Sequence, residues 1–420
     1  MKFFFPDSQD LVDPSFDFST EERSPTRIRQ RDDLYPHEVF AEAPYDGMLV
    51  SKAIVDGTGD GGRYTLAQRH RLLREGVRAF CRLEGRPIET MGDCGAFSYV
   101  REERPPFTVR EVIDFYVQCR FDYGLSVDHV ILAYQAELDD LLPGLAEVPA
   151  EWRKRQRITL ELAEEFLHLH ADLGCTFTPV GVAQGWSPAS YATAVEELQK
   201  IGYCYIALGG MVPLKTPEIL ACLRRIGRVR KPETRIHLLG VTRIEQVHEF
   251  RGLGVVSFDS TSPLRQAFKD DRDNYYTMDR KYSAIRVPQI EGNVRMRSRI
   301  VAGEVNQQEA KRLEQGCMEA LLRFDTGESA LEEVLRLLRD YEKIHDGKGD
   351  RSAVYREILE ARPWKDCPCE ICRSLGVHVM LFRGADRNRR RGFHNLFVFE
   401  RRLRQLTGAS AADSRQGEHP

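Results

Sequence analysis

The sequence lacks a run of about 18 consecutive apolar residues, the minimum for a helix that crosses a membrane. Its first apolar run, Phe3-Phe4-Phe5, is too short for a secretory signal. Ten cysteines among 420 residues are too dilute for a disulfide scaffold. From these absences we expect a cytoplasmic protein that makes no membrane contact.

An excess of charge of one sign is also absent. The 61 basic and 64 acidic side chains give a formal net charge of -3. This excludes a uniformly basic coat for nucleic acid, but it allows a local basic face. The three tryptophans are few for the aromatic sugar platforms of an ordinary glycosidase. With 42% hydrophobic and 30% charged residues, the composition is that of a globular protein with a sizeable core.

Short apolar runs alternate with amphipathic helical stretches from about residue 47 onward. Near-continuous apolar runs are typical of buried parallel strands, and the later ones follow each other at the spacing of βα units. Eight such units favour an α/β fold, a (β/α)8 barrel of TIM type, over an open doubly wound sheet. The predicted strands are Met48–Ile54, Ile88–Met91, Leu125–Leu132, Thr178–Ala183, Cys204–Leu208, Ile236–Leu239, Val255–Phe258 and Ser283–Val287.

The remaining sequence differs in character from the barrel region. Its beginning is polar and irregular, whereas strong helical patterns replace the strands after about residue 300. The predicted organisation is an irregular extension (1–45), a catalytic barrel (46–300), a helical zinc-binding subdomain (301–406) and a polar tail (407–420).

The sharpest local signal is Cys367-Pro-Cys369-Glu-Ile-Cys372. Three thiols this close together can converge on one tetrahedral zinc ion, which then needs a fourth ligand. His378 and His394 are both near enough, and we prefer His394 because the intervening segment can then loop back. The alternative is a turn with three unliganded cysteines. A closed site of four ligands predicts one structural zinc per chain that helps to fold the C-terminal part.

Acidic, amide and glycine residues follow several predicted strands. The carboxyl ends of the strands form the active site in a barrel. A single aspartate after a strand is usually a helix cap, and Gly-Gly is usually a turn. Several polar groups gathered at one rim instead favour a binding site, because burying them together is unfavourable unless they bind something. These residues are Asp93, Asp128, Gln184, Gly209, Gly210 and Asp259.

Six segments resemble, in the same order, motifs of the tRNA-guanine transglycosylase superfamily. The most specific is Phe258-Asp-Ser-Thr-Ser-Pro-Leu-Arg-Gln-Ala267, which is similar to the catalytic segment of those enzymes. The other five are Gly92-Asp-Cys-Gly-Ala-Phe97, Val182-Ala-Gln-Gly185, Ala207-Leu-Gly-Gly210, His237-Leu-Leu-Gly-Val241, and the cysteine cluster with Phe393-His-Asn-Leu396.

The resemblance implies exchange of a guanine in nucleic acid for a 7-deazaguanine base. Asp259 would be the nucleophile that attacks C1′ of the sugar, and Asp93 would be the acid/base group. Two successive displacements then retain the configuration of the sugar, as in retaining glycosyl transfer. The residues that would bind the substrate are Asp128, Gln184, Gly209, Gly210, Met211, Phe97 and Arg265.

Several positions depart from the motifs of the queuosine enzymes. Ala96 stands for a glycine, Ser98 for a glutamine, and Asp128-His-Val130 for Asp-Glu-Cys. A shifted alignment would place Tyr134 where Asp128 is matched. With these departures the sequence looks like the DpdA branch, whose members insert 7-cyano-7-deazaguanine into DNA as part of a modification and restriction gene cluster with accessory proteins. The alternatives are an enzyme that acts on tRNA and a non-catalytic nucleic-acid-binding paralogue.

Two basic clusters suit contact with phosphate. One extends from Ala385 to Gln405, where arginines are interleaved with phenylalanines, and the other begins at Trp152. A solvated loop is the alternative interpretation of the first cluster. The arginines predicted to contact nucleic acid are Arg389, Arg390, Arg391 and Arg401.

Overall fold

The computed structural model describes residues 1–57, 64–139, 148–269, 272–345 and 350–408. These residues form two compact units. The barrel unit comprises residues 1–9, 45–261 and those from 403 onward, and the second unit comprises residues 10–44 and 262–402. In the ranges described, no helix is long and apolar enough to cross a membrane.

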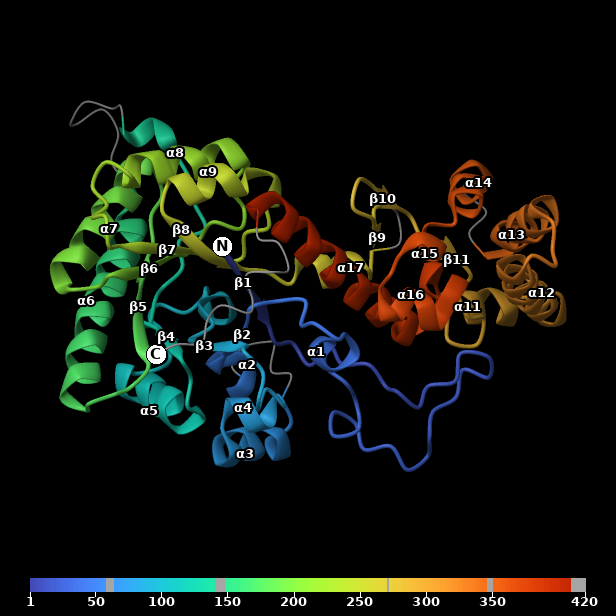
Figure 1. Cartoon of the computed structure of the whole chain (residues 1–420), viewed down its shortest axis with the longest axis horizontal. Coiled ribbons are helices and arrows are strands. Elements are labelled where there is room, and N and C mark those ends of the chain that lie inside the picture. Colours follow the sequence, from blue (N-terminus) through green and yellow to red (C-terminus); the bar gives the residue numbers. More distant parts are fainter. Residues whose placement is uncertain (58–63, 140–147, 270–271, 346–349, 409–420) are drawn as a thin grey trace. The chain divides into compact units, whose positions relative to one another are not determined.

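Eight parallel strands close into a barrel in which neighbours in sequence are neighbours in space (Figure 1). This confirms the predicted (β/α)8 fold. Side chains fill the barrel interior, and Met91, Leu125 and Val180 lie in one buried cluster. The strands are β1 (Lys2–Pro6), β2 (Gly47–Ser51), β3 (Glu89–Asp93), β4 (Tyr123–Leu125), β5 (Thr178–Ala183), β6 (Tyr205–Leu208), β7 (Arg235–Leu238) and β8 (Val255–Asp259).

Strand β1 closes the barrel, and the prediction of an irregular extension over 1–45 is wrong for this segment. Its parallel partners are β2 and β8, with Phe4 opposite Gly47 and Phe3 opposite Phe258. Phe3 and Phe4 are fully buried. The strand is short, and it pairs with segments that are distant in sequence, so no local pattern reveals it.

Helices cover the outside of the barrel, and some of them begin and end at recognisable signals. Helix α7, for example, follows β5: Ser187 caps its first turn, Pro188 opens it, and it ends at Gly202, whose φ of 126° favours glycine. The α-helices described in this unit are α2 (Lys52–Asp56), α3 (Leu66–Glu75), α4 (Val77–Phe80), α5 (Val109–Cys119), α6 (Ala150–Asp172), α7 (Pro188–Ile201), α8 (Thr216–Ile226) and α9 (Val247–Gly252).

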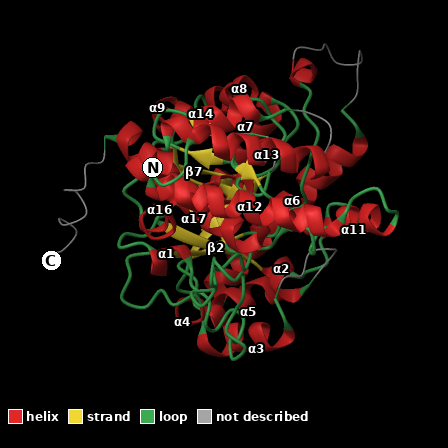
Figure 2. Cartoon of the chain, turned by 90° about the vertical axis from the view of Figure 1, so that its right-hand side faces the viewer, coloured by secondary structure: helices red, strands yellow, loops and turns green. Residues whose placement is uncertain are grey.

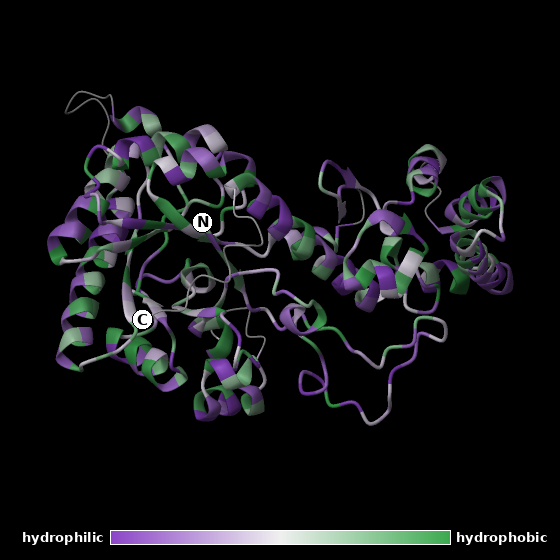
Figure 3. Cartoon of the chain, in the orientation of Figure 1, coloured by the Kyte–Doolittle hydropathy of each residue, from purple (hydrophilic) through white to green (hydrophobic). Residues whose placement is uncertain are grey.

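Hydropathy follows this arrangement, since the helices carry hydrophobic residues beside hydrophilic ones along their length (Figure 3). In α5 the residues Val112, Ile113 and Tyr116 are buried, whereas Arg110 and Asp114 are exposed and form an ion pair. A helix with one apolar face packs that face on the strands and leaves the other in water.

The second unit is mostly helical (Figure 2). Its segment 10–44 contains one short helix, and it is held partly by Glu21, which accepts a hydrogen bond from Arg383 Nε at 2.6 Å. Helices predominate after residue 300, as predicted, whereas this unit also includes residues 10–44 and begins at residue 262 rather than 301. The helices of this unit are α1 (Pro36–Val39), α10 (Ser262–Gln266), α11 (Val294–Val301), α12 (Gln307–Thr326), α13 (Leu331–His345), α14 (Ser352–Ala361), α15 (Pro363–Asp366), α16 (Glu370–Leu375) and α17 (Gly384–Thr407), whose last residues belong to the barrel unit.

Three predicted strands differ from the structure, and one of them, Met48–Ile54, is a strand only to Ser51 and continues as helix α2. The run Ser283–Val287 contributes only β11 (Ile285–Arg286), which pairs with β12 (Leu381–Phe382) in the second unit. Strand β1 therefore occupies the place in the barrel that was predicted for this run. The continuous part of the barrel unit ends at residue 261 rather than 300. The run Leu125–Leu132 leaves the sheet after its first residue, and a buried loop continues it. Of the predicted polar tail 407–420, residues 409–420 lie outside the described residues.

The backbone of Gly124 in β4 lies close to two aromatic rings, so a larger residue there would test the packing of the barrel wall. A Cβ atom there would lie 2.5 Å from Tyr116 Cδ2 and 2.7 Å from Phe177 Cε2. Both rings are buried, and the Tyr116 hydroxyl donates to the Leu125 carbonyl at 3.0 Å, so neither ring can move aside freely. We expect Gly124→Ala to lower the free energy of unfolding in urea by about 1–3 kcal/mol.

Gly252, at the end of α9, is the matched control for this substitution. Its Cβ would have no neighbour within 4 Å. Gly252→Ala should leave the free energy of unfolding unchanged or slightly raised. Equal effects of the two substitutions would contradict the packing assigned to β4.

Candidate active site and metal centre

The polar residues predicted at strand ends lie at one end of the barrel. Asp93 is the last residue of β3, and Asp259 is the last residue of β8. Gln184 and Gly209 directly follow β5 and β6. Because all eight strands are parallel, these strand ends form a single rim. It is the rim that carries the active site in TIM barrels.

Asp259 is buried, and its carboxylate is held on one side only. Its Oδ1 atom accepts the Gly240 amide at 3.0 Å and lies 3.2 Å from Nε2 of His237. The described residues make no hydrogen bond to Oδ2. The lone pairs of that oxygen are therefore not used by these neighbours.

Asp93 has the chemistry of a group that can hold a proton near neutral pH. Its side chain is half-buried at the rim. Burial, followed by the negative charge of Asp128, raises its pKa to about 7, and Asp259 adds to this effect. A carboxyl group with such a pKa can act both as an acid and as a base.

Asp128 and Gln184 are brought into direct contact. Gln184 Nε2 donates to Asp128 Oδ2 at 2.6 Å, and the amide of Ile131 donates to Gln184 Oε1 at 3.1 Å. The Cys94 thiol donates to the other oxygen of Asp128 at 3.0 Å, and the Tyr99 hydroxyl donates to Cys94 Sγ at the same distance. Burial raises the pKa of the Asp128 carboxyl. Cys94 and Tyr99 are thus parts of the site that sequence reasoning did not identify.

The two glycines after β6 allow close approach to Gln184. A Cβ on Gly209 would lie 2.1 Å from Gln184 Nε2. A Cβ on Gly210 would lie 2.5 Å from the Ile131 carbonyl, and its φ of 72° also favours glycine. Met211, which follows them, is fully buried. The glycines are therefore needed for packing around Gln184, whatever they do for a substrate.

The other two predicted substrate residues make none of the hydrogen bonds of this cluster that the described residues show. Phe97 lies in the short 3-10 helix after β3, and its side chain is exposed. Arg265 belongs to the second unit, where Nη2 lies 3.8 Å from Asp10 Oδ2.

A row of buried polar side chains leads to Asp259, and sequence reasoning missed it. His237 Nδ1 lies 2.7 Å from Ser257 Oγ, which in turn lies 2.5 Å from the Tyr205 hydroxyl. The sequence did carry a signal for this row, namely the polar residues His237 and Ser257 inside the apolar runs of β7 and β8. Such groups are buried only with hydrogen-bond partners.

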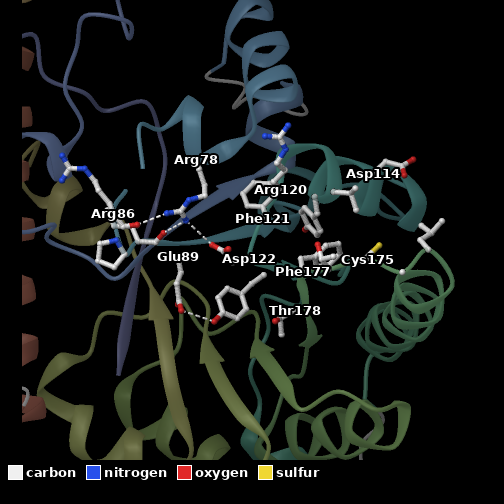
Figure 4. Close-up of a pocket in the computed structure, with 18 of the residues that line it drawn as sticks. Arg78, Arg86, Glu89, Asp114, Arg120, Phe121, Asp122, Cys175, Phe177 and Thr178 are labelled. Carbon is white, nitrogen blue, oxygen red and sulfur yellow. Dashed lines mark hydrogen bonds and ion pairs between the residues drawn. The ribbon is translucent and has the colours of Figure 1, made fainter. Parts of the chain in front are cut away.

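A cavity of about 930 Å³ lies at the opposite end of the strands (Figure 4). Its lining includes Glu89, Tyr123 and Thr178, which are the first residues of β3, β4 and β5. Charged residues here pair with each other, as Arg78 does with Asp122 at 3.7 Å. The amino ends of barrel strands generally serve stability rather than catalysis.

Four side chains of the second unit converge as a candidate metal centre. The ligand atoms of Cys367, Cys369, Cys372 and His394 all lie within 4.8 Å of one another. Nδ1 of His394 faces the sulfur atoms at 3.3–3.5 Å, while Nε2 donates to the Tyr276 carbonyl at 2.8 Å. The second bond leaves Nδ1 with a lone pair for a metal ion. These four residues could therefore hold one metal ion.

The structure selects His394 rather than His378 for this cluster. His394 lies inside helix α17. His378 instead packs against Phe18, with Nδ1 at 3.4 Å from the guanidinium of Arg387.

The arginines predicted to contact nucleic acid are divided by burial. Arg391 is fully buried and donates to the carbonyls of Leu381 at 2.9 Å and Ala267 at 2.6 Å. Arg390 is also buried and donates to the Asp13 carbonyl. For these two the prediction is wrong, because their donors hold the second unit together.

The remaining two arginines keep some exposure. Arg389 is half-buried, with Nε at 3.9 Å from Asp10 Oδ1. Arg401 is exposed, and its guanidinium lies 4.5 Å from the centre of the Phe397 ring. Phosphate contact stays a prediction for them.

The raised pKa of Asp93 predicts a pH-dependent cost to stability. Between about pH 4 and 7 the folded protein keeps a proton that the unfolded chain has lost, so stability falls as pH rises through this window. Asp93→Asn should remove this fall and raise the free energy of unfolding at pH 8 by on the order of 2 kcal/mol. Urea unfolding at pH 4.5 and pH 8 measures the difference. Asp114→Asn, on an exposed side chain of α5, is the control and should have little effect. The same pH dependence in wild type and Asp93→Asn would contradict the assignment.

Loss of one thiol should remove the metal ion. We expect Cys369→Ser to lower the metal content from about one ion per chain and to destabilise the second unit, because metal binding to four converging ligands contributes to folding. Elemental analysis and thermal unfolding measure both effects. Cys204→Ser, at an exposed cysteine outside the cluster, is the control and should change neither. A wild-type protein that contains no metal would contradict the assignment.

Comparison with known proteins adds to this geometry. No family model matches the chain. A curated protein of Salmonella montevideo named DNA-guanine transglycosylase is 49% identical over 418 residues, which cover 98% of this chain and 99% of that protein. An alignment over this much of the chain includes residues of both units. It confirms the predicted superfamily and the enzyme class, guanine transglycosylase. The chain belongs to the DNA-guanine transglycosylase family.

Proposed function

We propose that this protein exchanges guanine in DNA for 7-cyano-7-deazaguanine through a covalent aspartyl–glycosyl intermediate. The observation that carries the proposal is the contrast between two carboxyl groups at one rim of the barrel. Asp259 has one oxygen held by neighbours and the other free, whereas Asp93 has a pKa of about 7. One group is suited to attack and the other to proton transfer.

In the first step, Oδ2 of Asp259 attacks C1′ of the deoxyribose and the C1′–N9 bond of guanine breaks. The electron pair of that bond stays on the guanine, which takes a proton from Asp93. The raised pKa of Asp93 supports this role, because a good fraction of the group is protonated at neutral pH.

In the second step the incoming base replaces the ester. Asp93, now a carboxylate, takes the proton from N9 of 7-cyano-7-deazaguanine, and N9 attacks C1′. The C1′–O bond to Asp259 breaks and its electron pair returns to the carboxylate. Both aspartates end in their starting states, and two inversions retain the configuration at C1′.

Asp128 and Gln184 are suited to read the base. The Watson–Crick edge of guanine offers N–H donors next to a carbonyl oxygen. A carboxylate can accept from the donors, and an amide N–H can donate to the oxygen. The contact between Asp128 Oδ2 and Gln184 Nε2 supports a joint role, with Cys94 as a further restraint on Asp128. A 7-deazaguanine presents the same edge, so both bases can use one pocket.

The target nucleotide must leave the duplex to reach a barrel rim, as in other enzymes that act on bases. We propose that Arg389 and Arg401 contact the phosphate backbone, since both keep exposed surface. The family further suggests that the enzyme acts with accessory proteins in a DNA modification and restriction system.

We propose zinc as the ion at Cys367, Cys369, Cys372 and His394. Three thiolates and one imidazole are a common donor set for tetrahedral zinc. Four protein ligands leave no open position, so the ion would stabilise the second unit and take no part in the exchange.

A covalent adduct tests the role of Asp259. Enzyme incubated with guanine-containing DNA and then denatured should carry DNA on the protein, visible as a shifted band on a denaturing gel. We expect Asp259→Asn to lower the rate of adduct formation by about 1,000-fold or more, since an amide oxygen is a poor nucleophile. An adduct formed at the wild-type rate would overturn the proposal.

Asp122→Asn provides the matched control. Asp122 is a barrel carboxylate at the opposite end of the strands, where it accepts hydrogen bonds from Thr90. Its substitution should leave adduct formation unchanged, and thermal unfolding should confirm that both variants fold.

A further inference from the structure

We propose that His237 is a positioning residue for Asp259, and that Ser257 and Tyr205 hold it in the form that can do this. The proposal rests on the proposed role of Asp259 as the nucleophile. It concerns which oxygen of the carboxylate attacks and what keeps that oxygen in place.

The row of polar side chains crosses three adjacent strands inside the barrel. Tyr205 begins β6, His237 lies in β7, and Ser257 and Asp259 lie in β8. His237 and Ser257 are paired residues of neighbouring strands. His237 and Ser257 have no exposed surface, and Tyr205 is 3% exposed. Each hydrogen bond in this row is therefore shielded from water.

The protons of this row can be assigned from its partners. An ionised Asp259 can only accept, so Nε2 of His237, at 3.2 Å from Oδ1, must carry the proton. Nδ1 of a neutral ring then accepts from the Ser257 hydroxyl at 2.7 Å. The Ser257 oxygen in turn accepts from the Tyr205 hydroxyl at 2.5 Å. Each N–H and O–H group of the three side chains then donates one hydrogen bond.

A doubly protonated ring fits this row less well. Nδ1 would then donate to Ser257, and one of the two hydroxyl protons of Ser257 and Tyr205 would need another acceptor. The described residues offer neither hydroxyl such an acceptor. The row therefore fixes the neutral tautomer with its proton on Nε2.

Two N–H donors on one oxygen orient the carboxylate. His237 and the Gly240 amide both meet Oδ1, which prevents the group from turning about its Cβ–Cγ bond. Oδ2 is thereby directed to the sugar, and the enzyme avoids the loss of rate that a misplaced nucleophile causes. A neutral donor also leaves the negative charge of the carboxylate available for attack.

Variants at position 237 distinguish this role from simple core packing. His237→Phe removes both nitrogen atoms, and we expect it to lower the rate of adduct formation by about 100-fold while KM for DNA stays unchanged. His237→Gln places an amide N–H near the position of Nε2 and should recover most of the rate. His237→Asn, whose shorter amide cannot reach Oδ1, should behave like the phenylalanine variant.

Ser257→Ala tests the tautomer assigned to His237 without changing Asp259 or the two donors that hold it. We expect it to lower the rate of adduct formation by about tenfold, because Nδ1 loses its donor and the ring is no longer held in one tautomer. Ser126→Ala is the matched control, a buried barrel serine whose hydroxyl accepts the Val182 amide at 3.0 Å. It should leave the rate unchanged. This pair keeps the proposal testable even where His237→Phe does not fold.

Wild-type rates of adduct formation in both His237→Phe and Ser257→Ala, with changes only in thermal stability, would overturn the proposal. Its failure can be separated from that of the proposed function. Should Asp259→Asn abolish the adduct while the His237 and Ser257 variants keep it, only the positioning role is wrong. Should Asp259→Asn keep the adduct, the nucleophile itself is wrong.

Discussion

Closure of the barrel by β1 is the constraint on which the rest of the site depends. This five-residue strand supplies the hydrogen bonds that join β8 to β2. Without it, β8 would be an edge strand, and the rim would be open between β8, which carries Asp259, and β2, the neighbour of β3 with Asp93. The buried rings of Phe3 and Phe4 hold the strand in the sheet by hydrophobic packing. Catalytic geometry at the carboxyl rim thus depends on apolar contacts within the barrel wall.

The closed rim also creates the electrostatics that the proposed chemistry needs. Three carboxyl groups, those of Asp93, Asp128 and Asp259, come close enough to influence one another. Each finds a different environment: Asp259 meets backbone and imidazole donors, Asp128 meets a thiol and an amide, and burial together with the charge of Asp128 raises the pKa of Asp93. The same burial that destabilises a charged Asp93 makes it an acid at neutral pH, so some stability is given up for function.

Much of this could be predicted from the sequence, for physical reasons. Near-continuous apolar runs gave seven of the barrel strands, at least in part, because buried parallel strands need such runs. The spacing of Cys367, Cys369 and Cys372 predicted the cluster that could hold a metal ion, because thiols so close in sequence converge easily. Strand β1 was not predicted because its partner strands, β2 and β8, are far away in sequence. Arg390 and Arg391 were misjudged because arginines in a row suggest a charged surface, whereas a helix turns them to different sides.

The central claim is that the substrate is DNA, and base exchange on different nucleic acids tests it most directly. Purified protein would be supplied with radiolabelled guanine and offered duplex DNA, single-stranded DNA and tRNA in parallel. The account predicts label in DNA and none in tRNA. Label in tRNA with none in DNA would contradict it.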